Sequence, residues 1–318
     1  MKKYIEFIVS EINKITTTCG EVLLFGENID KGSCLSGLSR GLEVNSNGKI
    51  INIGNCELTH FGIGLGMMLD GGNSVLFAKQ MDFILLGLEQ ACSTFNFIRA
   101  YKSRNEVGSF TIVCIVCDQG FQGPQSSSNN ASDISSLANI PIYCINFKDD
   151  IAKIINDNLV AKGFRIIFVS QRAFNSEINK IPLIYGENDC SIFKYYGGRD
   201  VTLASYNFAL PETLKIRNYL KSNGFESDLY HINYVPNHSL EPILNSIKKT
   251  GKLIVIDDSK SIKKYGDYLA TNILKNGIKC DYIDQIRRGS EDKNYGVNHD
   301  QMIFDYEKIL KFVSNRIS

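Results

Sequence analysis

The chain has 318 residues, of which 43% are hydrophobic and 22% are charged, and its formal net charge is +1 at pH 7. This balance is typical of a globular protein with one large hydrophobic core or two of ordinary size. A net charge so close to zero gives no bulk attraction to nucleic acid or to an anionic membrane, so neither is expected as a partner. The longest apolar runs, such as residues 61–69, are too short to cross a bilayer.

The N-terminal residues and the cysteines indicate the compartment. The chain opens with a polar-faced helical pattern and not with the charged and apolar regions of a secretion signal. Its nine cysteines are scattered, mostly inside apolar runs. Cys114 and Cys117 form C-x-x-C, but they would point to opposite faces of a strand, and no second pair completes a zinc site. Reduced, packed thiols in a cytoplasmic protein are therefore expected.

Residues 1–175 alternate between strand-like and helix-like patterns. The expected helices are about 5–19, 57–70, about 81–104 and 149–162, and the expected strands are 21–25, 74–77, 111–117, 141–145 and 165–169. Residues 32–48 and 118–133 are rich in turn-forming residues and are expected to be loops. This alternation predicts a mostly parallel sheet with helices on both faces.

A second alternation follows a segment of mixed polar and aromatic character. Its expected strands are 200–204, 227–232, 252–257 and 279–284, and its expected helices are 211–223, 240–249, 260–276 and about 304–313. The sequence thus predicts an α/β fold with two doubly wound domains, at 1–175 and 199–318, joined by a linker at 176–198.

Glycines recur within the helical pattern that begins at residue 57. Gly62, Gly64 and Gly66 form G-x-G-x-G, but Met67 stands where the dinucleotide fingerprint needs its third glycine, and no strand leads directly into the motif. Gly62 and Gly66 are one helical turn apart and would leave a groove for a packed helix or for a ligand, and both interpretations remain open. Neither a G-x-S-x-G elbow nor a phosphate-binding P-loop occurs in the sequence.

Glu57 stands at the head of this apolar helix. A carboxylate beside so much apolar surface is costly to bury unless a partner group meets it. It could be a first-turn carboxylate favoured by the helix dipole, or it could have a function. Composition does not decide between the two.

Several motifs follow one another across almost the whole chain. They are G-E-N-I at residues 26–29, E-x-x-x-F-G-x-G-x-G at 57–66, M-D-F-I-L-L-G-L-E-Q at 81–90, G-F-Q-G-P-Q at 120–125, G-R-D-V-T at 198–202 and K-T-G-K-L-I-V at 249–255. This series resembles the beta subunit of the thiamine-diphosphate-dependent decarboxylating component of 2-oxo acid dehydrogenases, and more widely the transketolase family. The resemblance implies a pyrimidine-binding domain followed by a transketolase C-terminal domain.

The resemblance also implies the roles of site residues. Glu57 would be the catalytic residue, hydrogen-bonded to the ring nitrogen of the cofactor's aminopyrimidine. Phe83 would stack on that ring, with core packing as the alternative, and Glu27, Gln80 and Leu86 complete the implied cofactor-binding set. An apolar setting favours the neutral form of a carboxyl group, which would allow Glu57 to share a proton with the nitrogen.

The family's diphosphate-binding domain carries a G-D-G motif and a downstream Asn that hold Mg²⁺. No G-D-G occurs here, and Leu69-Asp70-Gly71-Gly72 lies in the wrong place. The resemblance therefore implies no metal ligand on this chain and an alpha-type partner subunit that holds Mg²⁺ and the cofactor's diphosphate. It implies a heterotetramer that is active only with that partner.

Some residues depart from the family pattern. In the loop where the dehydrogenases have G-P-Q-H-S, Ser126 follows Gln125 and replaces the histidine, and these two residues are the expected substrate contacts. A hydroxyl group cannot serve as a near-neutral acid or base. We therefore expect a thiamine-diphosphate-dependent enzyme that makes or breaks a carbon–carbon bond beside the carbonyl of a 2-oxo acid, ketose or other sugar. A non-catalytic assembly or regulatory subunit and a conventional lipoyl-dependent dehydrogenase subunit are the alternatives.

Overall fold

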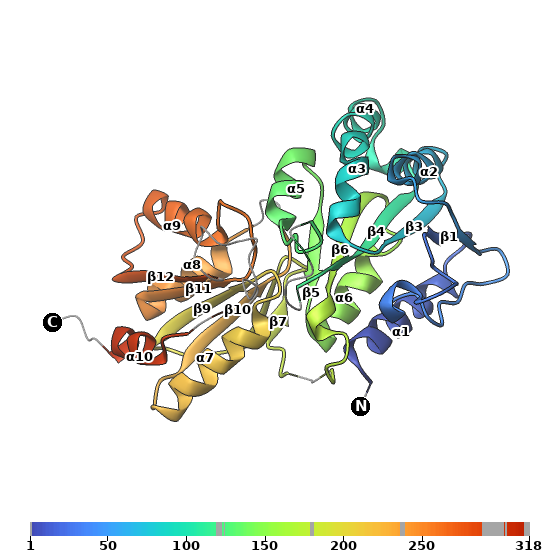
Figure 1. Ribbon diagram of the computed structural model, residues 1–318. Coiled ribbons are helices and arrows are strands. Elements are labelled where there is room, and N and C mark those ends of the chain that lie inside the picture. The colour runs from blue at the N-terminus through green and yellow to red at the C-terminus, as the bar shows by residue number, and fades with distance from the viewer. Residues whose placement is uncertain are drawn as a thin grey trace. The chain divides into compact units, whose positions relative to one another are not determined.

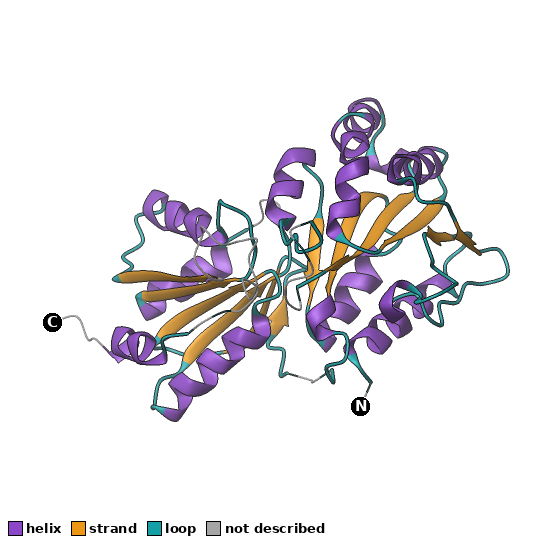
Figure 2. Cartoon of the chain, viewed as in Figure 1, coloured by secondary structure: helices purple, strands orange, loops and turns teal. Residues whose placement is uncertain are grey.

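The computed structural model describes residues 2–118, 123, 125–178, 181–235, 239–287, 302 and 304–314. The chain forms two compact units, residues 1–129 with 133–180 and residues 130–132 with 181–318 (Figure 1). Within the described residues, each unit contains a six-stranded sheet with helices on both faces (Figure 2). This confirms the predicted α/β fold with two doubly wound domains.

The sheet of the first unit has the strand order β2-β1-β3-β4-β6-β5, and all of its strand pairs are parallel. Its strands are β1 (Leu23–Gly26), β2 (Lys49–Asn52), β3 (Asn73–Ala78), β4 (Ser109–Val116), β5 (Ile142–Ile145) and β6 (Gly163–Ser170). Its helices are α1 (Tyr4–Thr16), α2 (Glu57–Leu69), α3 (Met81–Cys92), α4 (Thr94–Tyr101), α5 (Ala131–Ala138) and α6 (Lys148–Asn158), with short 3-10 helices at Leu35–Gly37, Arg104–Glu106 and Gln171–Ala173.

The helices cover this sheet in two layers. Helices α1 and α6 pack together on one face, and α2, α3 and α4 lie on the other (Figure 1). Between the second group and the sheet, Phe61 of α2 and Phe95 of α4 meet the ring of Phe164 edge to face, at centroid distances of 6.0 Å and 5.3 Å. The ring of Phe110 stacks on Phe164 at 4.8 Å. This aromatic cluster holds α2 at a fixed height above β4 and β6.

The strands of this unit end at a topological switch point. The connection after β1 leads outward to β2, whereas the connection after β3 leads in the opposite direction to β4. The loops that follow β1 and β3 therefore separate, and the carboxyl ends of these neighbouring strands border a crevice. In open α/β sheets, ligands bind in this position.

The second sheet has the order β12-β11-β9-β10-β8-β7, in which β7 and β8 are antiparallel to their neighbours. Its strands are β7 (Tyr185–Gly186), β8 (Ile192–Tyr196), β9 (Val201–Tyr206), β10 (Ser227–Ile232), β11 (Lys252–Asp257) and β12 (Tyr282–Arg287). Helices α7 (Leu210–Ser222) and α10 (Tyr306–Ser314) cover one face, and α8 (Glu241–Thr250) and α9 (Tyr265–Lys275) cover the other (Figure 1). The same reversal of direction separates β9 from β11.

Four local features differ from the expectations. Strand β2 follows the expected loop 32–48, where no strand was predicted, and α5 begins inside the expected loop 118–133 and continues to Ala138, where no helix was predicted. The long helix expected over about 81–104 is two helices that meet at Ser93. Strands β7 and β8 lie in the segment expected to be a linker and pair with the second sheet. Most of residues 285–300, expected to be a polar segment, lies outside the described residues.

Two further findings concern the whole of the described chain. None of its helices is both long enough and apolar enough to cross a bilayer. All nine cysteines are free. Cys114 and Cys117 are 0% and 2% exposed, and burial raises the pKa of the Cys117 thiol to about 12. The C-x-x-C pair is therefore packed in the core, as predicted.

Candidate functional site

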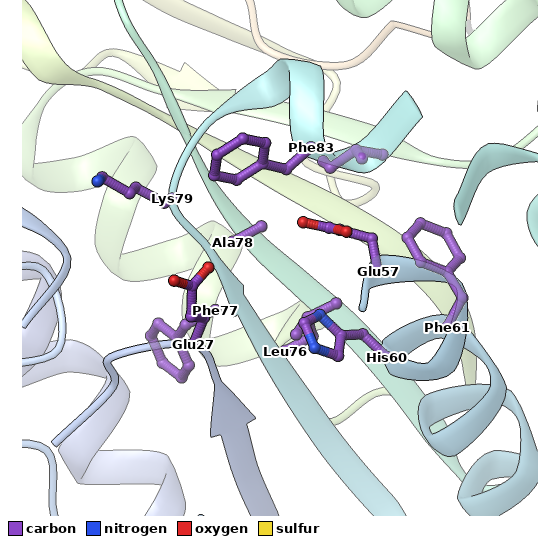
Figure 3. Close-up of a pocket in the computed structure, with 10 residues that line it drawn as sticks. Glu27, Glu57, His60, Phe61, Leu76, Phe77, Ala78, Lys79 and Phe83 are labelled. Carbon is purple, nitrogen blue, oxygen red and sulfur yellow. The ribbon is translucent and has the colours of Figure 1, made fainter. Parts of the chain in front are cut away.

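A pocket lies at the carboxyl ends of β1 and β3, at the switch point of the first sheet (Figure 3). It is lined by Glu27, Glu57, His60, Phe61, Leu76, Phe77, Ala78, Lys79, Phe83 and Ile84. Its volume is about 20 Å³, which is space for a water molecule and not for an aromatic ring. The wall is mostly apolar, with two carboxylates and one ammonium group at its border.

Glu57 reaches this pocket because it is the first residue of α2. Its side chain is half-buried, and its carboxylate points into the space below the ring of Phe83 (Figure 3). The positive end of the α2 dipole favours a negative charge here. His60, one turn further on, is 5% exposed, and its Nε2 lies 2.7 Å from the carbonyl oxygen of Gly54. Because a carbonyl only accepts hydrogen bonds, this nitrogen carries the proton and ties α2 to the loop before Glu57.

Glu27 reaches the same pocket from β1, which ends one residue earlier at Gly26. A Cβ atom on Gly26 would lie 2.5 Å from the carbonyl oxygen of Phe77, so only glycine allows β1 and β3 to approach this closely. The amide N–H of Ile29 donates to Oδ1 of Asn52 at 2.7 Å and links the loops after β1 and β2. The glycine of the motif G-E-N-I thus has a direct structural reason.

Phe83 lies in the first turn of α3, above Glu57 (Figure 3). The distance between α2 and α3 is set by Gly87, where a Cβ atom would lie 2.1 Å from the ring of Phe61. Gly64 has the same function towards the sheet, since a Cβ there would lie 2.2 Å from the ring of Phe110. The close packing that brings Glu57 and Phe83 together therefore depends on Gly64 and Gly87.

The groove expected at Gly62 and Gly66 does not hold a neighbouring helix of this unit. No described atom lies within 4 Å of a Cβ built on either glycine. Both glycines are exposed, so neither packs against a described part of this chain, and contact with another molecule or with a ligand stays a prediction.

Asp82, which precedes Phe83 in the first turn of α3, contacts the loop after β4. Its side chain is only 8% exposed, and its Oδ2 accepts a hydrogen bond from Nε2 of Gln125 at 3.2 Å. Burial raises the pKa of Asp82, and the nearby negative charge of Glu57 raises it further. Oδ1 of Asp82 is buried and has no hydrogen-bond partner among the described residues. This hydrogen bond links Gln125, an expected substrate residue, to the first turn of α3, which also carries Phe83.

The other expected site residues lie apart from the pocket lining. Gln80 is half-buried and precedes α3 as its N-cap residue. Leu86 is 64% exposed on α3. Ser126 is half-buried beside Gln125. Of the G-F-Q-G-P-Q motif, residues 120–122 and 124 lie outside the described residues.

Three residues of the site escaped the sequence reasoning: Lys79, His60 and Asp82. Lys79 directly follows the buried strand β3, a position that by itself predicts a side chain at the carboxyl edge of the sheet. His60 has no second histidine at the spacing of a metal site, and its contact with Gly54 depends on the conformation of the loop before α2. Asp82 lies inside the quoted motif M-D-F, but only its burial distinguishes it from a solvated first-turn carboxylate.

The described residues contain no group of three or more His, Cys, Asp or Glu side chains that could hold a metal ion. The pocket itself combines a carboxylate, an aromatic ring and apolar walls. At the mouth of the pocket, these groups could contact a flat, partly apolar ring that carries a basic nitrogen.

No protein-family profile matches the chain. It is similar to the chloroplastic pyruvate dehydrogenase E1 component subunit beta-3 of Oryza sativa subsp. japonica, with 21% identity over 88% of this chain and 70% of that protein. The chloroplastic subunit beta-2 of Arabidopsis thaliana is 21% identical over 72% of this chain and 56% of its own length. In the subunit beta of Rhizobium meliloti, the matched stretch is 24% identical and covers 27% of this chain and 18% of that protein. The matches thus cover from under a fifth to 70% of these relatives.

The fold matches a solved structure described as a split gene transketolase, an inactive beta4 tetramer. The TM-score is 0.64 at 14% sequence identity, and the match covers 96% of this chain and 97% of that chain. The fold is therefore of the transketolase-like class. Together with the pyruvate dehydrogenase relatives, this match supports the family that the sequence motifs predict, the thiamine-diphosphate-dependent beta subunits and their transketolase-like relatives.

Proposed function

We propose that this chain is the beta-type subunit of a two-subunit, thiamine-diphosphate-dependent enzyme that makes or breaks a carbon–carbon bond next to a carbonyl. The observation that carries the proposal is the convergence of Glu57 and Phe83, from the first turns of two helices, on one pocket at the switch point. The resemblance to pyruvate dehydrogenase beta subunits and to a split gene transketolase supports it.

The groups around the pocket fit the aminopyrimidine half of the cofactor. Glu57 offers a half-buried carboxylate for a ring nitrogen, and Phe83 offers an aromatic face. When bound, thiamine diphosphate supplies a carbon nucleophile and an electron sink for the carbonyl substrate.

In this proposal the chain's own residues control a proton. Glu57 holds or shares the proton at the ring nitrogen, and the α2 dipole keeps its carboxylate available for this contact. Phe83 positions the ring and excludes water from the Glu57 oxygens. Asp82, whose pKa is raised by burial and by Glu57, remains neutral to higher pH than an exposed aspartate and limits the repulsion between the two carboxyl groups.

We propose that a second chain completes the site. The pocket of about 20 Å³ is too small to enclose a pyrimidine ring, so the ring would lie at its mouth, where another chain would cover it. We assign the diphosphate and Mg²⁺ to an alpha-type partner, because this sequence has no G-D-G motif. The structural neighbour is itself a beta4 tetramer, which supports self-association of this type of chain in the larger assembly.

The loop at Gln125 and Ser126 bears on the substrate. Gln125 donates to Asp82 in the first turn of α3, and this contact supports a position for the loop near the approach of a carbonyl substrate. Ser126 stands where the dehydrogenases have histidine, and it can donate or accept a hydrogen bond but cannot act as a near-neutral base. We therefore propose a 2-oxo acid or ketose as donor, with an aldehyde, ketone or sugar as acceptor.

Turnover by the complex of this chain with its partner tests the function. Pyruvate, branched 2-oxo acids and ketose phosphates would be assayed with thiamine diphosphate and Mg²⁺, and product formation from one of these classes is expected. A complex that binds the cofactor and turns over none of them would contradict the proposal and favour a non-catalytic assembly subunit.

The replaced histidine is the specific observation that favours this second candidate, a scaffold that keeps the fold without turnover. A third, lipoyl-dependent candidate is tested by supplying a lipoyl domain with the 2-oxo acid. Acylation of the lipoyl group would assign the chain to the dehydrogenases. Turnover without acylation would assign it to the transketolase-like transferases.

A further inference from the structure

A second pocket lies at the opposite edge of the same sheet, where β4 and β6 begin. Its volume is about 290 Å³. It lies between α4, the turn that leads into β4 and the turn that leads into β6. The residues that line it are Phe95, Ile98, Arg99, Lys102, Ser103, Arg104, Val107, Asn139, Pro141, Lys162, Gly163, Phe164 and Arg165.

The lining is strongly cationic. Five of its side chains are positively charged, namely Arg99, Lys102, Arg104, Lys162 and Arg165, and no described lining residue is acidic. Glu106 lies on the same turn as Arg104, but its carboxylate accepts from the amide of Ser103 at 2.7 Å and does not line the pocket. Because like charges repel at close range, such a cluster is stabilised when an anion occupies it.

The guanidinium groups are held in place by carbonyl oxygens. Nη1 of Arg99 donates to Asn139 at 2.7 Å, and Nε of Arg104 donates to Lys162 at 2.8 Å. Nη2 of Arg165 donates to the same Lys162 carbonyl at 2.6 Å, and the Arg165 side chain is 1% exposed. A guanidinium has five N–H donors, so Arg99 and Arg104 keep further donors for a ligand after these bonds. Prior orientation lowers the entropy cost of binding.

The floor of the pocket is apolar. Phe95, Val107 and Phe164 are 9%, 6% and 2% exposed, and the rings of Phe95 and Phe164 meet edge to face at 5.3 Å. The guanidinium carbon of Arg99 lies 5.5 Å from the centre of the Phe95 ring. Convergent charged donors above an apolar floor are the usual composition of a small-molecule site.

We propose that this pocket binds a small organic phosphate, with the phosphate group on the arginine and lysine rim and a short apolar or aromatic portion on the phenylalanine floor. Arginine side chains form strong charge-assisted hydrogen bonds with phosphate oxygens, which favours this class of anion. The inference does not depend on the thiamine diphosphate site, because the two pockets lie at opposite ends of the parallel strands.

Three probes separate the two halves of the proposed ligand: phenyl phosphate, inorganic phosphate and benzyl alcohol. Binding to the full chain would be measured by calorimetry at low and at high salt. Phenyl phosphate is expected to bind most tightly, with inorganic phosphate weaker and benzyl alcohol weakest. The affinity for phenyl phosphate should fall at high salt, because salt screens the positive charges of the pocket.

Variants locate the binding. The double variant Arg99→Gln/Lys102→Gln should weaken phenyl phosphate binding by about tenfold or more, because it removes two charged hydrogen-bond donors. Lys49→Gln is the matched control, since it removes an exposed lysine on β2 away from this pocket, and it should bind as the parent does. Circular dichroism checks that both variants fold.

Two results would overturn the inference. One is equal affinity of the parent and the folded double variant for phenyl phosphate, which would place binding elsewhere. The other is the absence of phenyl phosphate binding up to millimolar concentration. Poly-glutamate, an acidic polymer, would be titrated as a fourth probe. If it bound and phenyl phosphate did not, the inference would be overturned and the pocket would be a surface for an acidic macromolecule.

Discussion

The two sheets have the same switch-point topology, but the acidic residue at each point has a different environment. Glu57 is half-buried and lines a pocket. Asp257, at the end of β11, is 0% exposed, and its two oxygens accept from the amides of Ser259 at 2.8 Å and Tyr265 at 3.1 Å. One carboxylate remains available to a ligand, whereas the other closes the turn into α9. Topology therefore offers two possible sites, and the hydrogen-bond partners indicate which one can be functional.

The aromatic residues show the same difference. In the second unit, Tyr206 at the end of β9 stacks on Tyr265 of α9 at a centroid distance of 4.5 Å. In the first unit, Phe83 stands above the pocket and leaves a face for a ligand (Figure 3). The stacked tyrosines at the switch point of the second unit therefore contribute to folding stability, whereas Phe83 in the first unit can contribute to ligand binding.

The largest expected effect is on catalysis. Glu57→Gln should lower turnover by the complex by about 10²–10⁴-fold, the usual contribution of a positioned acid or base. The unfolding free energy should change by less than about 0.5 kcal/mol, because the side chain is only half-buried. Initial rates and chemical denaturation would be measured on the same preparation. A large loss of stability with unchanged turnover would contradict this account, because it would give Glu57 the structural role that we assign to Asp257.

Asp257→Ala should have the opposite profile. It leaves the amides of Ser259 and Tyr265 without their acceptors in a buried turn, and we expect a loss of about 2–4 kcal/mol in unfolding free energy. Denaturation followed by circular dichroism measures this loss. Asp70→Ala, which removes an exposed carboxylate, is the control and should stay within about 0.5 kcal/mol of the parent. Equal effects of the two variants would remove the structural role of Asp257.

A buried histidine of the second unit, His231, should contribute to the pH dependence of the unfolding free energy. Burial lowers the pKa of His231 to about 3, and its Nδ1 lies 3.1 Å from Oγ of Ser205. In the unfolded chain the pKa is about 6.5, so as pH falls below that value the unfolded state takes up a proton that the folded state does not. The contribution is fully present above pH 6.5 and is lost as pH falls towards 3.

We expect about 2–3 kcal/mol of this contribution to disappear between pH 7 and pH 4. His231→Gln should have a flatter profile over this range than the parent, whatever its stability at pH 7. Parallel profiles for the two proteins would show that His231 does not titrate in this way.

The smallest effects distinguish the two faces of α2. Gly64→Ala should destabilise the chain by about 1–2 kcal/mol, because the new methyl group would overlap the ring of Phe110. Gly62→Ala faces open space and should stabilise the chain by up to about 1 kcal/mol through helix propensity. Thermal unfolding of the two variants checks this difference. If both destabilise equally, α2 does not have the buried and open faces described above.

The sequence predicted the regular alternation of the fold, because its apolar runs mark the buried strands and helix faces. It did not predict β2, whose side chains alternate between exposed and half-buried at the edge of the sheet, or α5, whose serines also suit a loop. The break at Ser93 has no proline or glycine to mark it, and the packing of Phe95 against Phe164 just after it joins residues far apart in the sequence.

For the site, the ordered motifs indicated Glu57, Glu27 and Phe83, which line one pocket. Sequence could not reveal the contact of Asp82 with Gln125, because it joins residues 43 positions apart, one in the first turn of α3 and the other in the loop after β4. For Gly62 and Gly66 the sequence left packing and ligand contact open, since the pattern cannot show which face of a glycine-rich helix meets a neighbour. Tertiary contacts between residues distant in sequence decided each of these cases.

The most direct test of the account is the affinity of the complex for its proposed cofactor. Thiamine diphosphate with Mg²⁺ would be titrated calorimetrically into the complex of this chain with its partner, once with the parent chain and once with Glu57→Ala. The account predicts saturable binding to the parent complex and a loss of at least about 100-fold in affinity for the intact variant complex, because the ring would lose a charge-assisted hydrogen bond in a dry site. Equal affinity of the two complexes would contradict the role of Glu57 in holding the pyrimidine ring.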